Sequence, residues 1–338
     1  MSEDLNQVAG AERRVKPWPG RLKLLLRVVV SAALLAYLLT VTIPAEDLGK
    51  ILTVFLTADP FNLLLALLCV LADRFLSAWK WMLLLRVREP DLPLLPVVKI
   101  FFISTFIGYF LPASVGGDAI RAFSLSRINR DLAGSATSVV IDRAYGVFGL
   151  MAISSIALIP AIGAYVSPTD AAVIWALTAA ALAGVVLISS RTAYRWFTSI
   201  ARLRKGGLIR SKLTKLVNAS SEYAGRKRVL VRVFSYSMVV QVLRVLLGVY
   251  CGAALGLEVD LSIYFIAMPI VAVVTLLPIS VGGFGVREAA FIYFFTRAGV
   301  PAYACLSLSL LYIAMGILVL VPGAVIFAFW GIGKKGAK

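Results

Sequence analysis

The segment LPASVGGDAIR at residues 111–121 recurs as LPISVGGFGVR at residues 277–287, about half the chain length further on. Each copy ends a strongly apolar stretch, which places it at membrane depth. Proline, a glycine pair and arginine are costly inside a bilayer unless they line a cavity within the protein. A helix-breaking polar element that occurs twice in a hydrophobic chain is typical of a transporter built from two repeats.

The composition is that of a polytopic membrane protein and not of a soluble enzyme. Of the 338 residues 60% are hydrophobic, and the formal net charge is +17. The sequence contains no histidine, which is the commonest general base and metal ligand. Its three cysteines, Cys69, Cys251 and Cys305, stand isolated in apolar runs and show no disulfide or metal spacing. We therefore expect no cofactor and no metal ion.

Apolar stretches long enough to cross a bilayer lie at residues 24–43, 61–85, 133–160, 169–190, 229–256 and 301–331. Two more apolar stretches end at the glycine pairs, and a short predicted helix follows each; they are 100–117 with 118–130, and 261–281 with 284–297. We interpret each combination as a re-entrant helical hairpin that returns to the side from which it entered. Residues 44–60 are predicted to be a loop.

The distribution of basic residues predicts the topology, because cytoplasmic loops carry the excess of lysine and arginine. Six spans place every strongly basic segment on the cytoplasmic side, namely 1–23, 86–99, 127–131, 191–228 and 333–338. The loops 44–60, 161–168 and 257–260, which are acidic or uncharged, then lie outside. The two hairpins consequently enter from opposite faces, and their glycine tips meet near the middle of the bilayer.

The predicted fold is therefore an all-α polytopic membrane protein with six full spans plus two re-entrant helical hairpins in inverted repeats. It forms one transmembrane domain over residues 24–332, in which repeat 1 covers about 61–190 and repeat 2 about 229–332. A parallel duplication of ordinary helices is the alternative. Both tails, 1–23 and 333–338, are predicted to be cytoplasmic, and the protein is expected in the cell (inner or plasma) membrane.

The segment 191–228 combines eleven lysine and arginine residues with one acid, Glu222, and with spaced apolar side chains. This pattern predicts a helical segment that lies in the inner interface against anionic lipid. A solvated loop is the alternative. We expect no nucleic-acid partner, because the basic residues follow membrane topology and do not gather on one exposed face. A homodimer is left open.

The repeated motif has the features of an anion site. Glycine lets the backbone turn sharply and approach a ligand closely. The helix that follows points free N–H groups and its positive dipole end into the membrane interior, and such an end binds phosphate or carboxylate. Two inverted copies would bring Arg121 and Arg287, each one turn into its helix, to a single cavity. The alternative is a helix break that only packs the repeat interface.

The two copies differ in their carboxylates. Asp118 of the first copy is replaced by Phe284, whereas Glu288 follows the second arginine at the position where the first copy has Ala122. Asp118 has three interpretations: a helix cap, a contact to an amine-bearing headgroup, or a proton carrier. The predicted substrate-binding residues are Ser114, Gly116, Gly117, Asp118, Arg121, Ser280, Gly282, Gly283, Arg287 and Glu288.

Further charged residues lie inside the predicted spans, where a lone charge costs roughly 2.5–3.5 kcal/mol on insertion scales. We expect each to pair with another span, either along a substrate pathway or as an ion pair that only holds the bundle together. The predicted cavity charges are Asp73, Arg74, Asp142, Arg143 and Arg244. Lys80, Trp79 and Trp81 are interpreted as anchors at the inner interface.

Together these motifs resemble the transmembrane region of lysylphosphatidylglycerol synthase/flippase proteins and the stand-alone membrane proteins related to it, over about residues 20–332. The matching residues are Arg74, Trp79 and Trp81; Pro112, Gly116, Gly117, Asp118 and Arg121; Asp142, Arg143 and Gly146; and Pro278 with Gly282 to Glu288. The resemblance implies a membrane region that moves lipids between leaflets. Full-length members also carry a soluble domain that transfers an aminoacyl group from tRNA to lipid. Nothing in the sequence matches that domain, so the resemblance does not imply aminoacyl transfer.

The expected function is that of a lipid translocase, or flippase, and not of an enzyme. It would move an anionic or phosphate-bearing lipid between leaflets through a central cavity. The sequence has no Walker-type nucleotide loop, so the energy would come from a lipid gradient, the membrane potential or protons carried by Asp118, Asp142 or Glu288. Two alternatives stay open: a membrane-embedded transferase acting on polyprenyl-phosphate-linked substrates, with Glu46, Asp47 and Asp59 as its carboxylates, and an accessory protein that transports nothing.

Overall fold

The computed structural model describes residues 18–110, 116–159, 162, 166–189, 222–223, 225–276, 280 and 282–330. Within these ranges the chain is helical, apart from turns and one isolated bridge between Ile162 and Val166. Among the described residues, five helices are long and apolar enough to cross a membrane, and six if one bent pair counts as a span. The protein is therefore an all-α polytopic membrane protein.

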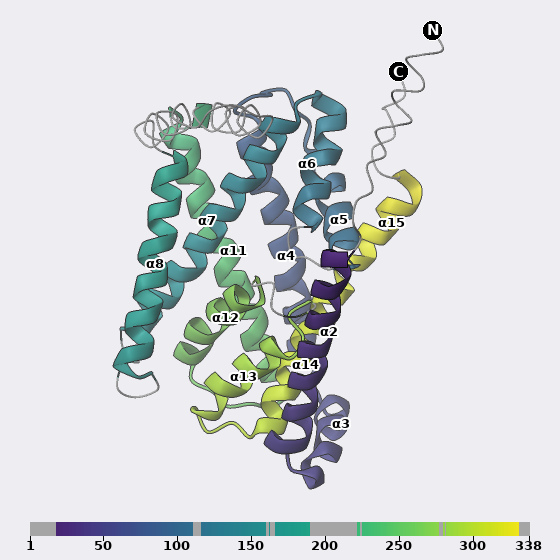
Figure 1. Ribbon diagram of the computed structural model, residues 1–338, viewed down its shortest axis with the longest axis vertical. Coiled ribbons are helices and arrows are strands. Elements are labelled where there is room, and N and C mark those ends of the chain that lie inside the picture. Colours follow the sequence, from purple (N-terminus) through teal and green to yellow (C-terminus); the bar gives the residue numbers. More distant parts are fainter. Residues whose placement is uncertain are drawn as a thin grey trace.

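The long helices coincide with predicted spans. They are α4 (Pro60–Leu85), α7 (Leu132–Leu158), α8 (Pro168–Ser189), α11 (Lys227–Ala254), and α14 (Ala302–Leu318) continued by α15 (Leu320–Trp330). They run roughly along the long axis of the molecule (Figure 1). Most of the basic segment 191–228 lies outside the described residues, and so does Ser114.

The N-terminal region corrects one prediction. Residues 44–60, expected to form a loop, contain η2 (Ala45–Asp47) and α3 (Leu48–Leu56). The preceding span, α2 (Trp18–Tyr37) with η1 (Leu38–Thr42), bends by 100° into α3 at Ile43 and Pro44, which have extended backbone angles. Val54 and Phe55 of α3 pack on the hydrophobic core, and this burial explains why the short apolar segment folds as a helix.

Each predicted hairpin is a pair of short helices. The first consists of α5 (Leu94–Phe110) and α6 (Gly116–Asn129), the second of α12 (Leu261–Leu276) and α13 (Val286–Thr296). Figure 1 shows α5 and α6 in the upper half of the molecule and α12 and α13 in the lower half. The two pairs thus lie toward opposite ends of the long helices.

The glycine pairs have different structural roles in the two hairpins. Gly116 and Gly117 are the first residues of α6. In the second hairpin Gly282, Gly283 and Gly285 all have positive φ, at 61°, 81° and 84°, and α13 begins only after them. The second tip therefore needs glycine for its backbone conformation, whereas Gly117 is required for close packing.

Gly117 brings α6 into backbone contact with α5. A Cβ atom on Gly117 would lie 2.9 Å from the Ser104 carbonyl oxygen, and one on Gly108 would lie 2.6 Å from the Gly117 Cα atom. Both neighbours are backbone atoms that cannot swing aside. The two helices can therefore approach this closely only because neither residue has a side chain.

We predict that Gly108→Ala lowers the free energy of unfolding by about 1–3 kcal/mol, because overpacking forces the helices apart. Reversible unfolding in mixed detergent micelles measures this. Gly184→Ala on α8 is the matched control, since nothing lies within 4 Å of the Cβ it would add. Alanine is the better helix former, so the control should be neutral or slightly stabilising. Equal destabilisation by both substitutions would contradict the packing argument.

The helix α12 lies between α7 and α11. Its Tyr264 and Met268 pack against Gly252 and Gly248 of α11, where no Cβ atom would fit. On the other side, the Ser154 hydroxyl of α7 donates a hydrogen bond of 3.2 Å to the carbonyl of Ile266. Because α12 is packed between α7 and α11 in this way, its C-terminal end lies against a cavity that the long helices bound.

Candidate functional site

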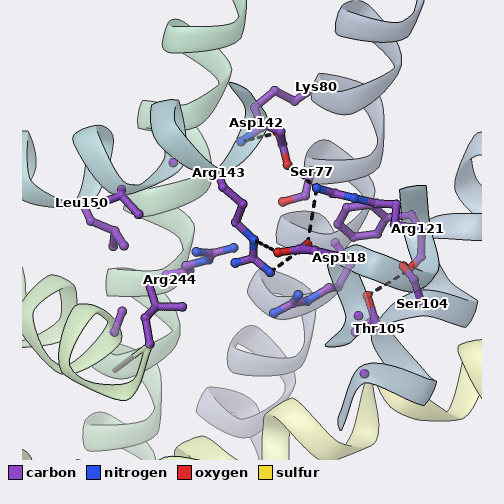
Figure 2. A pocket seen from close by; sticks show the side chains of 18 of the residues that line it. Ser77, Lys80, Ser104, Thr105, Asp118, Arg121, Asp142, Arg143, Leu150 and Arg244 are labelled. Carbon is purple, nitrogen blue, oxygen red and sulfur yellow. Dashed lines mark hydrogen bonds and ion pairs between the residues drawn. The ribbon is translucent and has the colours of Figure 1, made fainter. Parts of the chain in front are cut away.

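A polar cavity of about 230 Å³ lies inside the bundle. At about 30 Å³ per water molecule it has room for several waters or a small polar group. Six helices contribute to its wall (Figure 2), through Arg74, Ser77 and Lys80 of α4; Phe101, Ser104, Thr105 and Gly108 of α5; Gly117, Asp118 and Arg121 of α6; Asp142, Arg143, Gly146, Val147 and Leu150 of α7; Gln241 and Arg244 of α11; and Ala272 and Leu276 of α12.

Asp142 is the centre of a buried ion network. Its Oδ1 lies 3.0 Å from the Lys80 ammonium, and its Oδ2 accepts a hydrogen bond of 3.1 Å from Arg121 Nη2. All three residues are almost fully buried, with exposed fractions of 7% or less. Lys80 also donates to the Ser237 hydroxyl of α11 at 3.2 Å. The network ties α4, α6, α7 and α11 together.

Asp118 forms a second, more accessible group. It accepts two hydrogen bonds from Arg143, at 2.6 Å from Nε and 3.1 Å from Nη2, and lies 3.5 Å from Arg121. The side chain of Arg143 is 49% exposed, in contrast to the buried Arg121. Figure 2 shows both side chains directed at the Asp118 carboxylate. This carboxylate thus holds a bidentate partner that an entering anion can reach.

Aromatic rings fix the position of Arg121. Its guanidinium carbon lies 4.7 Å from the ring centre of Trp81 and 5.4 Å from that of Phe101. Trp81 is itself fully buried and donates its indole N–H to the Ser138 hydroxyl at 3.0 Å. Cation–π contacts gain strength when they are desolvated in this way. Arg121 is therefore a positive charge with little freedom to move.

A third group of charges lies on α4 and α11, and its members on α4 are further from the ends of that helix than Lys80 is. Asp73 Oδ1 accepts a hydrogen bond of 2.9 Å from Arg244 Nε, and its Oδ2 lies 3.1 Å from Arg74 Nε. Gln241 links this group to α7, because it accepts from Arg244 at 3.3 Å and donates to the Gly146 carbonyl at 3.0 Å. Asp73 lies near the middle of α4, about 18 Å from its C-terminal end at 1.5 Å per residue. The cavity thus has charged groups at two depths.

The cavity keeps an excess of positive charge after its internal pairing. The lining contains five cations, Arg74, Lys80, Arg121, Arg143 and Arg244, and two carboxylates, Asp118 and Asp142. Asp73 adds a third carboxylate behind the wall. A concave site of one sign with low-dielectric walls concentrates counter-ions. Its chemistry is that of an anion site.

The second hairpin reaches this cavity through Ala272 and Leu276 of α12, and not through the described residues of its motif. Ser280, Gly282, Gly283, Arg287 and Glu288 are absent from its lining. The structure therefore does not bring the two motif arginines to one cavity. The other arginines that line the cavity with Arg121 are Arg74, Arg143 and Arg244. That residues of the second motif bind the substrate stays a prediction.

The contacts of Glu288 are those of a structural residue. Its fully buried carboxylate accepts a hydrogen bond of 2.6 Å from the Gly285 amide, as in a capping box, and one of 3.3 Å from the Ser309 hydroxyl of α14. Arg287 lies 3.4 Å from the same carboxylate and over the ring of Phe284. These contacts fasten the start of α13 to α14.

Sequence reasoning misplaced Lys80 and missed Gln241. The interpretation of Lys80 and Trp81 as interfacial anchors is wrong, because both are buried and bonded within the bundle. One signal could have found them. Asp73, Ser77 and Lys80 are spaced by four and three residues, which puts them on one face of a helix, and Gln241 and Arg244 are similarly spaced.

The comparisons with known proteins agree with this architecture. The family model described as the lysylphosphatidylglycerol synthase TM region matches residues 24–323. A search of curated proteins found no significant match. The matched region contains every charged residue of the cavity. The chain therefore belongs to the family of the lysylphosphatidylglycerol synthase transmembrane region.

Proposed function

We propose that the protein is a translocase that moves an anionic, phosphate-bearing lipid between the leaflets of the cell (inner or plasma) membrane. The observation that carries the proposal is the positively charged cavity inside an apolar helical bundle. The headgroup enters the cavity while the hydrocarbon chains stay in the bilayer. The family description supports a lipid of the phosphatidylglycerol class.

Arg143 is the proposed first contact of the phosphate. Its guanidinium is half exposed and already arranged to hold two oxygens, those of Asp118. Arginine presents its donors in a planar fork that matches phosphate as well as carboxylate. The phosphate replaces the Asp118 carboxylate as the partner of the Arg143 guanidinium. Meanwhile the buried network around Asp142 keeps the surrounding helices in place.

The deeper charges extend the route. Arg74 and Arg244 line the same cavity as Arg143, and each is more than a quarter exposed. A headgroup that leaves Arg143 thus meets further cations along the cavity. We also propose that the two hairpin repeats are inverted and that rocking of one against the other opens the cavity to each leaflet in turn. Both termini lie in the cytoplasm under this proposal.

Two of the three carboxylates of the alternative transferase, Asp47 and Asp59, have other partners. Asp47 pairs with Lys50 at 2.6 Å, and Asp59 accepts hydrogen bonds from the backbone of Phe61 and Asn62 as the N-cap of α4. These are contacts of a helix start and of a surface ion pair. The positive cavity favours the translocase.

The test is lipid exchange in liposomes. Purified protein should accelerate leaflet exchange of fluorescent phosphatidylglycerol about tenfold more than that of phosphatidylcholine, because the choline cation is repelled by the cavity. A tenfold preference corresponds to about 1.4 kcal/mol, a modest electrostatic difference. Dithionite quenching of the outer leaflet measures both rates, with protein-free liposomes as the reference. Exchange no faster than in the protein-free liposomes would overturn the proposal.

A further inference from the structure

An apolar groove of about 400 Å³ runs between α7 and α12, toward the end of the bundle where α7 ends and α12 begins. Its lining residues are Ile153, Ile156 and Ala157 of α7 and Leu261, Ser262 and Phe265 of α12. Ile153 is buried and forms the floor, whereas Ile156 is 63% and Leu261 is 52% exposed. The groove is thus open at the side of the bundle that faces lipid in a membrane.

The groove and the polar cavity are built from the same two helices. On α7, Leu150 lines the cavity and Ile153 lines the groove, about 4.5 Å apart along the helix axis. On α12, Phe265 lines the groove and Ala272 lines the cavity. The apolar groove and the polar cavity therefore lie on the same helix–helix seam, one turn apart on α7 and two turns apart on α12.

Pro269 divides α12 between these two sections. It has no amide hydrogen to donate, so the Phe265 carbonyl loses its partner within the helix. A helix bends most easily at such a position. The hydrogen bond from Ser154 to the Ile266 carbonyl fastens the seam one residue away from that free carbonyl. Pro269 thus separates the part of α12 at the groove, which Ser154 fastens to α7, from the part at the cavity.

We propose that this groove binds a hydrocarbon chain of the transported lipid while its headgroup occupies the cavity. The inference rests on the proposed translocase function and adds a site for the tail. A headgroup at cavity depth draws its chains along, and these need an apolar surface that lies next to the cavity and is open to the bilayer. The α7–α12 seam offers both properties.

Photo-crosslinking tests the site directly. Protein is reconstituted with phosphatidylglycerol that carries a diazirine on one acyl chain, and labelled residues are mapped by mass spectrometry. We expect labelling at residues 153–157 and 261–265 to exceed that at the exposed Val173 and Leu177 of α8 at least threefold. In Arg143→Ala the excess should vanish, since the headgroup is no longer held. Equal labelling of groove and α8 in the wild type means annular lipid only and overturns the inference.

A second experiment separates the groove from the proposed function. Ile156→Trp fills the groove from an exposed position and should slow phosphatidylglycerol exchange at least fivefold. Val140→Trp, at a 52% exposed position elsewhere on α7, should stay within twofold of the wild type. If the wild type exchanges lipid and the two variants have equal exchange rates, the tail site is overturned, whereas the proposed translocase function is not. Absence of wild-type exchange overturns the translocase, and the labelling pattern then decides whether a chain binds the groove.

Discussion

Asp142→Asn is expected to lower the free energy of unfolding by about 3 kcal/mol or more. Removal of one partner from a buried ion pair leaves an uncompensated buried charge, which typically costs 3–5 kcal/mol. Here two cations, Lys80 and Arg121, lose their shared carboxylate, and both are 4% exposed. Reversible unfolding in mixed detergent micelles measures the loss.

The matched control is Asp118→Asn, which is isosteric and also removes a shared carboxylate. Its partner Arg143 is half exposed, so solvent compensates the lost charge and the expected effect is about 1 kcal/mol. Adding Lys80→Met to Asp142→Asn should restore part of the stability, because one stranded cation is gone. Equal losses for the two asparagine variants, together with no restoration, would show that the Asp142 network does not hold the bundle.

Arg143→Ala is expected to slow phosphatidylglycerol exchange about 10- to 100-fold with little loss of stability. Hydrogen bonds to charged groups contribute about 1.5–3 kcal/mol, and the proposed route loses its first phosphate contact. Arg143→Lys should give an intermediate rate, because an ammonium cannot hold two oxygens in a planar fork. The same liposome assay measures all three proteins.

Arg232→Ala is the control for this prediction. Arg232 lies on α11 as an exposed residue outside the cavity lining, and its removal also lowers the net charge by one. Its exchange rate should stay within twofold of the wild type. If Arg143→Ala and Arg232→Ala have the same rate, overall charge and not the cavity governs transport.

The helical spans and the charged residues of the cavity follow from the sequence because both carry strong local signals. An apolar run of about twenty residues is long enough to cross the bilayer as a helix, and it has few alternatives to that structure. Charges inside such runs must find partners on other helices, and Asp73 with Arg244, and Asp142 with Lys80, do so. The identity of the partners was not predictable, since it depends on the rotation and depth of helices that are far apart in the sequence.

The internal repeat predicts two similar hairpins, but it does not predict the different surroundings of their arginines. The second copy has Phe284 where the first has Asp118, and its arginine lies over that ring and beside Glu288. One substituted carboxylate thus gives the arginine a different environment. The helix α3 escaped prediction for a related reason: nine residues carry too little pattern of their own, and their packing against the core stabilises them.

The aromatic cage around Arg121 limits how such a protein can work. Under the proposed function, we expect a guanidinium held by Trp81 and Phe101 and anchored by Asp142 to stay at one level of the bilayer during transport. The proposed phosphate would then be attracted to a fixed position, as in a carrier with a stationary binding site, and Arg121 would not move with the lipid. The proposal therefore places the conformational change in the barriers on either side of that position.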